Sequence, residues 1–419
     1  MREVFYRFFK EINSFNSILF ICLFSSSYVF FKNPFEFYFH YLFLIVLVPA
    51  FILKYGFPTI VIQLFSVPLL VGIAHILLGN CNSFTFIKVL GGLVLTFLFY
   101  YYILIKYKFD FKKIFSLYIK FSYWNSVVGV IQIISYLIGF KNGYDYSWIF
   151  NKGGFVEGGL VGLRVNSILS EPAQLAIVIS PALFISVRNI LYKKSHILNK
   201  YQSIIIVLIT LLTTSSVGFF GLLICVILNT QSFRFRYLLI GAFIFYLFFS
   251  ISYKYVSDFQ SRFDSAIGLW INEDFSLKNT NNSSFVLYNN LHIAKENLLH
   301  HPLFGTGLGS HEDAFNKYTL TGTIIKYDFA FNKKDGNSLF IRLCTETGLV
   351  GVFFIVFLTF KCFILKVDNK NKTQSLIISQ ALFILILLSL IRQGNYMLNG
   401  LPLIFLLYYH NYIEYKKVI

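Results

Sequence analysis

Residues 202–229 have the sequence QSIIIVLITLLTTSSVGFFGLLICVILN, an apolar run interrupted by the four hydroxyl residues at 213–216. As one straight helix the run would span about 42 Å, more than the roughly 30 Å hydrocarbon core of a membrane. Basic loops flank the run on both sides, and such loops favour the cytoplasm. We therefore predict a hairpin of two short helices broken near 213–216. A single long, tilted helix is the alternative.

The composition of the whole chain is that of a membrane protein. Of its 419 residues, 56% are hydrophobic and 13% are charged, against about 25% charged in soluble domains. This excludes a water-soluble enzyme, a disordered protein and a disulfide scaffold. The net charge of +17 lies in short loops between apolar runs, where it sets topology. We therefore expect no nucleic-acid partner.

Further apolar runs predict an all-α, polytopic integral membrane protein with about 12 transmembrane helices. Counting the hairpin as two spans places both termini in the cytoplasm. We expect the first run, which follows Arg2, Arg7 and Lys10, to be an uncleaved span. The runs outside the hairpin are 15–31, 38–53, 57–79, 84–105, 114–139, 173–191, 237–253, 338–360, 375–391 and 396–413.

The order of these runs predicts three regions. Residues 1–253 form a membrane bundle with spans 1–9 and an outward loop at 140–172. Residues 254–337 form a large outward element, and residues 338–419 hold spans 10–12. Within the outward element, apolar residues recur at helical spacing and stop before Pro302, which predicts an amphipathic helix. These residues are Leu287, Leu291, Ala294 and Leu298.

Arginines on the predicted outer side are the first candidates for chemistry. They are Arg164, Arg262, Arg342 and Arg392. Arginine keeps its charge at working pH and binds phosphate oxygens with two parallel hydrogen bonds. A protein that handles lipid-linked pyrophosphates needs such groups at the outer headgroup level. Topological charge or simple ion pairing is the alternative for each.

Two glutamates stand close to these arginines in the sequence. Glu171 lies at the mouth of the sixth span, where a carboxylate beside apolar surface can act as a general base or acid. Capping of the following helix is its alternative role. Arg342 and Glu346 are spaced i, i+4, so they share one helix face and can pair at membrane depth. Such a pair indicates a functional cavity, with a structural role as the alternative.

Histidines and glycines cluster in HHPLFGTGLGS (300–310), with His311 directly after it. No carboxylate or cysteine set accompanies the histidines, so we expect no metal site. Gly305, Gly307 and Gly309 follow a helix rather than a strand, which excludes a nucleotide-binding fingerprint and favours a tight turn. We expect no cofactor.

Three stretches in this order resemble the Wzy-type O-antigen polymerase and O-antigen ligase superfamily. They are RVNSILSEPAQLA (164–176), HHPLFGTGLGS (300–310) and NSLFIRLCTETGLVG (337–351). The resemblance implies a GT-C-like, metal-independent glycosyltransferase of the bacterial inner membrane with a periplasmic active site. Its donor and acceptor would be undecaprenyl-pyrophosphate-linked oligosaccharides. Membrane lipid and a chain-length regulator protein are further candidate partners.

The resemblance also suggests roles for single residues. By position, Arg164, and less closely Arg262, match arginines that hold the donor pyrophosphate, and we add Arg342 as a third candidate. Glu171 is the candidate catalytic base. Ligases carry a histidine directly before the Asn-Ser of the third stretch, whereas this chain has Gly336 there, which favours a polymerase. Further residues are expected to shape the cavity, namely Glu346, Asp335, Asn337 and His301.

The predicted function is therefore polymerisation of oligosaccharide repeat units into O-antigen or capsular polysaccharide. An O-antigen ligase acting on lipid A–core and a lipid-linked oligosaccharide flippase are the alternatives. The long outward element and the absence of matched broken helices in two halves speak against a transporter.

Overall fold

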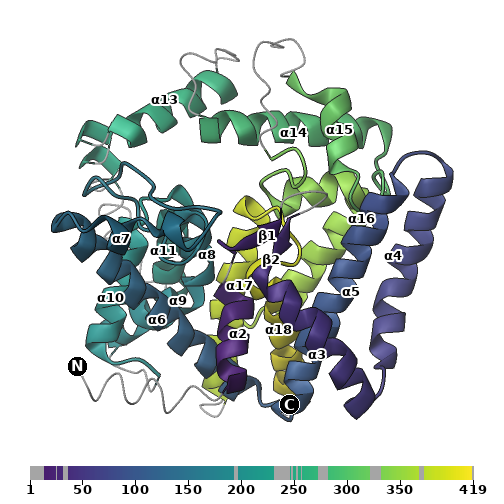
Figure 1. The fold of residues 1–419 in the computed structure, drawn as a ribbon, viewed down its shortest axis with the longest axis horizontal. Coiled ribbons are helices and arrows are strands. Elements are labelled where there is room, and N and C mark those ends of the chain that lie inside the picture. The colour runs from purple at the N-terminus through teal and green to yellow at the C-terminus, as the bar shows by residue number, and fades with distance from the viewer. Residues whose placement is uncertain are drawn as a thin grey trace.

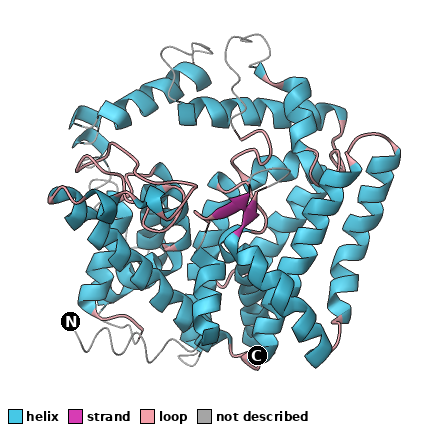
Figure 2. Ribbon diagram, viewed as in Figure 1, coloured by secondary structure: helices cyan, strands magenta, loops and turns pink. Residues whose placement is uncertain are grey.

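The protein is almost entirely helical (Figures 1 and 2). The computed structural model describes residues 14–24, 26–31, 36–192, 197–230, 246, 249–251, 253–255, 257–271, 282–320, 332–367 and 372–417. It is 75% helix and 2% strand, so the all-α prediction is confirmed. The two short strands β1 (Val29–Phe31) and β2 (Phe37–Tyr38) pair in antiparallel fashion.

The first five predicted spans correspond to five helices in the first third of the chain. The first is shorter than the predicted run, because its helix ends at Phe24 and the chain continues into β1. Polar caps begin two of the helices: Asn82 accepts from the N–H groups of Phe84 and Thr85, and Asp110 accepts from that of Lys113. The helices are α2 (Ser14–Phe24), α3 (Phe39–Tyr55), α4 (Thr59–Leu77), α5 (Ser83–Lys106) and α6 (Phe111–Leu137).

The helix break predicted at 213–216 is confirmed. Helix α10 (Lys200–Leu212) ends and α11 (Ser216–Asn229) begins there. Asn189 near the end of α9 (Ser180–Tyr192) donates to Ser203 at the start of α10. Tyr192 of α9 donates to the backbone carbonyl of Asn229 at the end of α11. Both outer ends of the pair therefore lie beside the same end of α9, which makes α10 and α11 an antiparallel hairpin.

The predicted sixth span is not one straight helix. It consists of α8 (Pro172–Val178) and α9, which are bent by 60° relative to each other. Before it, the loop 140–172, which is predicted to face outward, contains α7 (Lys141–Tyr144) and the 3-10 helix η1 (Tyr146–Trp148).

The predicted amphipathic helix is confirmed as α14 (Asn282–His300). Together with α13 (Ser257–Trp270) it lies across the ends of the bundle helices (Figure 1). Ala294 is buried against Ile341 and Cys344 of α16 (Leu339–Lys361), whereas Leu287, Leu291 and Leu298 on the same side are half-buried. The short helix α15 (His311–Tyr318) follows and packs against α14.

Helix α16 is broken at Gly348, whose φ of 60° and ψ of −160° interrupt the helical hydrogen bonding. The glycine-rich stretch after α14 replaces those bonds. Thr306 and Gly307 donate N–H groups to the carbonyls of Thr345 and Glu346, and the N–H groups of Leu349 and Val350 donate to the carbonyls at 302 and 303. The predicted tight turn therefore supplies hydrogen-bond partners for the backbone groups that the break in α16 leaves unpaired. Irregular backbone within a membrane needs such partners.

Five described helices are long and apolar enough to cross a membrane, or six if α8 and α9 count as one bent span. This supports a multi-pass membrane protein, and the total of twelve stays a prediction. The predicted ninth span, 237–253, lies almost wholly outside the described residues, as do Arg2, Arg7 and Lys10.

The last helices are α17 (Thr373–Arg392), η4 (Leu398–Gly400) and α18 (Leu401–Lys417).

Helix α17 is the centre of the bundle. It packs against α9, α11, α16 and α18, and most of its side chains are buried. Helices from the first and third predicted regions thus pack directly together. The division of the chain into three regions at residues 253 and 337 stays a prediction.

Candidate functional site

A cavity of about 710 Å³ lies where the hairpin tip, α13, the start of α14 and the end of α17 meet. Within the described part of its lining, the charged residues are Arg164, Glu171 and Arg392. Polar groups come from the hairpin tip, from the start of α14 and from residues 332–337, and phenylalanines of α11 and α13 supply much of the apolar wall. The cavity therefore combines two cations and one carboxylate with a largely apolar surface.

Arg164 is held in the cavity wall by the tip of the hairpin. Its Nε donates to Oγ1 of Thr214 at 3.1 Å, and its Nη2 donates to the Thr214 carbonyl at 3.4 Å. Gly159 passes close to this pair, since a Cβ there would lie 2.8 Å from Thr214 Oγ1 and 3.0 Å from Arg164 Cγ. The hairpin break thus positions the arginine of the first stretch.

Residues 166 and 167, just after Arg164, are anchored by buried polar side chains of α6. Gln132 Nε2 donates to Asn166 Oδ1 at 2.8 Å, and Gln132 Oε1 accepts the N–H groups of Asn166 and Ser167. Ser167 Oγ donates to the Asn125 carbonyl at 2.8 Å. Sequence analysis missed Gln132 and Asn125. Polar residues inside a predicted span were the available signal.

Glu171 lies at the N-cap position of α8, but its side chain makes no capping hydrogen bond. The carboxylate is exposed and lines the cavity. The capping alternative therefore stays open as an interaction of the Glu171 charge with the N-terminal end of α8, without a hydrogen bond. Pro172 occupies the first helical position, where its missing N–H costs nothing, and it directs the chain from the cavity into the bundle.

The other wall of the cavity comes from the third stretch and from the end of α17. Asn337, with a φ of 58°, lines the cavity together with Asn332, and Arg392 is the last residue of α17. Asp335 organises the turn between the two asparagines, because its Oδ1 accepts from Asn332 Nδ2 at 2.9 Å and from the Asn337 N–H at 3.1 Å. Asp335 thus shapes the wall without lining it.

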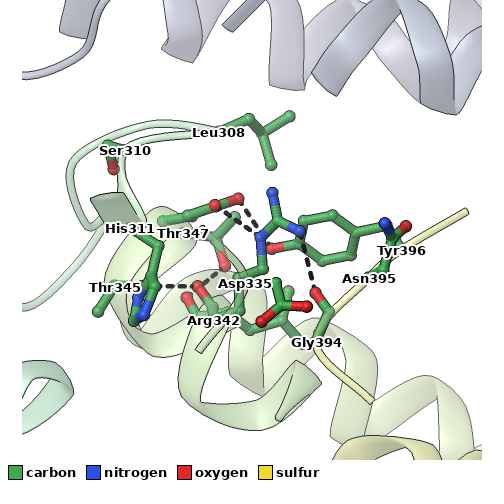
Figure 3. Close-up of polar contacts among 12 residues, drawn as sticks. Leu308, Ser310, His311, Asp335, Arg342, Thr345, Thr347, Gly394, Asn395 and Tyr396 are labelled. Carbon is green, nitrogen blue, oxygen red and sulfur yellow. Dashed lines mark hydrogen bonds and ion pairs between the residues drawn. The ribbon is translucent and has the colours of Figure 1, made fainter. Parts of the chain in front are cut away.

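The predicted pairing of Arg342 with Glu346 is confirmed, with Nε and Oε1 2.7 Å apart and both side chains buried. Figure 3 shows how the surrounding groups converge on the guanidinium. Its Nη1 donates to the Gly394 carbonyl at 2.9 Å, and its Cζ lies over the Tyr396 ring, 4.3 Å from the ring centre. The Tyr396 hydroxyl donates to Glu346 Oε2 at 3.0 Å.

Arg342 therefore joins two turns that carry cavity residues. Gly394 follows Arg392 by two positions and contacts the backbone at 335–337, since a Cβ on it would lie 2.0 Å from the Asp335 carbonyl oxygen. Neither Arg342 nor Glu346 is among the residues that line the cavity. The Arg342–Glu346 pair therefore lies behind the cavity wall.

The two histidines near the glycine-rich stretch differ in environment. His301 is half-buried just after α14, and burial, with the nearby charges of Lys317 and His300, lowers its pKa. It does not line the cavity. His311 is fully buried, with its ring nitrogens 2.9 Å from Thr345 Oγ1 and 3.1 Å from Asn290 Oδ1. Burial, and then the charge of Arg342, lowers the pKa of His311 to about 3.

Two predictions about the site stay open. Arg262 lies on α13, but its side chain is outside the described part of the structure. Within the described ranges, no group of three or more His, Cys, Asp or Glu side chains could hold a metal ion.

Comparison with known proteins adds no family assignment. No protein-family model matches the chain, and no curated protein sequence matches it. The functional argument therefore rests on the residues of this chain.

Proposed function

We propose that the protein is a polymerase that joins lipid-pyrophosphate-linked oligosaccharide repeat units by metal-independent glycosyl transfer. The observation that carries the proposal is the meeting of Arg164, Arg392 and Glu171 in one cavity. Two arginines suit a pyrophosphate, and a carboxylate in the same space suits an acceptor hydroxyl.

In the proposed reaction, an acceptor hydroxyl oxygen attacks the anomeric carbon of the donor sugar. The bond from that carbon to the pyrophosphate oxygen breaks, and lipid pyrophosphate leaves with the electron pair. Arg164 and Arg392, which both line the cavity, stabilise the charge that develops on the leaving group. Glu171 takes the proton of the acceptor hydroxyl. Arg392 is thus the second arginine proposed to bind the pyrophosphate, beside Arg164. Arg342 holds the turns next to Arg392 and Asn337.

The proposed location is the bacterial inner membrane, with the cavity on the periplasmic side. The distribution of lysines supports this orientation. Gly309 contacts Thr85 at the start of α5, on the side of the outward element, whereas Lys106, Lys112 and Lys113 cluster at the other end of that helix. Clustered lysines favour the cytoplasmic side.

The backbone at Gly336 favours the polymerase over the ligase. This glycine has a φ of 61°, and a Cβ on it would lie 2.9 Å from His311 Nε2. A histidine at this position, which the resemblance implies for ligases, would be strained and would collide with the His311 ring. The cavity edge has no room for that base.

Deletion of the gene in its own host, with surface glycan resolved by size on a gel, tests the proposal. Core carrying a single repeat unit, with the long ladder absent, supports a polymerase. Long polymer retained on undecaprenyl pyrophosphate indicates a ligase, and single units trapped inside the cell indicate a flippase. Complementation with Glu171→Gln, which keeps the side-chain shape and removes the charge, should leave the ladder absent while wild type restores it.

A further inference from the structure

A second, apolar groove of about 360 Å³ lies next to the cavity, along α16 and α17. Apolar side chains of α14, α16 and α17 form most of its lining, among them Leu287, Phe340, Phe360, Phe383 and Ile391. Both bundle helices qualify by length and composition as membrane spans. The groove therefore runs from the cavity along membrane-spanning segments.

The two hydroxyl groups of the groove are already hydrogen-bonded within the protein. Ser338 Oγ donates to the Leu390 carbonyl at 2.8 Å, and Thr359 Oγ1 donates to the Ile355 carbonyl at 2.7 Å. The remaining lining side chains are apolar, apart from the indole N–H of Trp270 at the rim. An apolar chain can occupy this surface without leaving a buried polar group unsatisfied.

The groove and the cavity adjoin each other, because they share two lining residues. Leu287 and Ile391 line both. Ile391 directly precedes Arg392, and Ser338 directly follows Asn337, so the polar wall changes to the apolar wall within one residue. A molecule with an anionic head and an apolar tail matches this change.

We propose that this groove binds the first part of the polyprenyl chain of the donor. This inference rests on the proposed function and adds a binding site for the lipid tail of its donor. From Ile391 to Phe383 it follows α17 for about 12 Å. At its far end the rings of Phe360 and Phe383 meet with centroids 5.9 Å apart. A tail in a bilayer already has apolar surroundings, so the groove orients the donor more than it adds affinity.

Photo-crosslinking in phosphatidylethanolamine and phosphatidylglycerol vesicles tests the groove. The photoreactive residue p-benzoylphenylalanine replaces Phe340 or Phe360, which line the groove, or Phe353, an exposed phenylalanine of α16 that does not. All three positions are aromatic in the wild type, so the replacement is mild and matched. The probe is undecaprenyl pyrophosphate, and adducts are identified by mass spectrometry.

The expected result is a polyprenyl adduct at 340 and 360 that exceeds the adduct at 353 by about tenfold. Adding Arg164→Gln and Arg392→Gln should reduce that excess, because the head anchors the tail. Equal adducts at all three positions, or phospholipid as the main adduct at 340 and 360, would overturn the proposal. A normal ladder after gene deletion would instead overturn the polymerase, so the two failures are distinguishable.

Discussion

Arg164 is the cavity residue whose replacement is most informative. Its contact with Thr214 uses Nε and Nη2, which form one edge of the guanidinium. Arg164→Ala should abolish long polymer, and Arg164→Lys should also reduce it strongly, because an ammonium cannot reproduce the planar fork. Loss of a charge-assisted hydrogen bond corresponds to a decrease in rate of about 10-fold to 150-fold. Surface glycan length on a gel, with protein level by immunoblot, checks this. Full-length polymer from Arg164→Ala would contradict the assignment.

The buried pair of Arg342 and Glu346 should affect stability more than chemistry. Arg342→Gln or Glu346→Gln alone leaves a buried partner without its counter-charge, which should lower the free energy of unfolding by about 3–5 kcal/mol. Replacing both with apolar residues of similar size should recover much of that loss. Thermal unfolding in detergent measures each step. Equal loss in the double and single variants would show that an unpaired buried charge is not the cause of the loss.

His311 should make the protein sensitive to acid. Its pKa is lowered to about 3 in the folded protein, chiefly by burial, so the folded state keeps the ring neutral while an unfolded chain protonates it near 6.5. Stability is therefore complete above about pH 6.5 and is lost by up to about 1.4 kcal/mol for each pH unit as the pH falls toward 3. Unfolding curves from pH 7 to about pH 4 check the slope. His311→Gln should show a flatter dependence in this range.

At the scale of elements, the break in α16 depends on Gly348. A Cβ there would lie 2.5 Å from the Gly305 nitrogen and 2.6 Å from the Leu303 carbonyl oxygen. Gly348→Ala should therefore separate α16 from the glycine-rich stretch and cost about 1–3 kcal/mol or more. Thermal unfolding measures the loss. Gly91→Ala in α5 is the control, because nothing lies within 4 Å of its Cβ and alanine favours helix.

At the scale of the whole molecule, the orientation can be tested with two lysines on opposite sides of the predicted span 114–139. Lys112 precedes the span and Lys141 follows it, and both are exposed. In spheroplasts, a cysteine at Lys141 should react with an impermeant maleimide, and a cysteine at Lys112 should react only after lysis. The five native cysteines are buried, so their background is low. The reverse pattern would invert the proposed topology.

The sequence by itself determined the features that depend on local pattern. Hydrophobic runs located most of the long helices of the bundle, and helical periodicity located α14, whereas α13 and α15 were not predicted. The excess length and hydroxyl residues of 202–229 predicted the break between α10 and α11. The spacing of Arg342 and Glu346 predicted their pair, because residues four apart lie on one helix face.

Only the tertiary structure decided which distant residues meet. Arg164 and Arg392 lie far apart in the sequence. They share a cavity because α17 packs against both α9 and α16. Arg342 was expected to bind pyrophosphate, but its guanidinium lies behind the wall and holds the turn at Gly394. The physical reason is that packing of separate helices, rather than local spacing, determines whether a polar side chain faces a cavity or another segment.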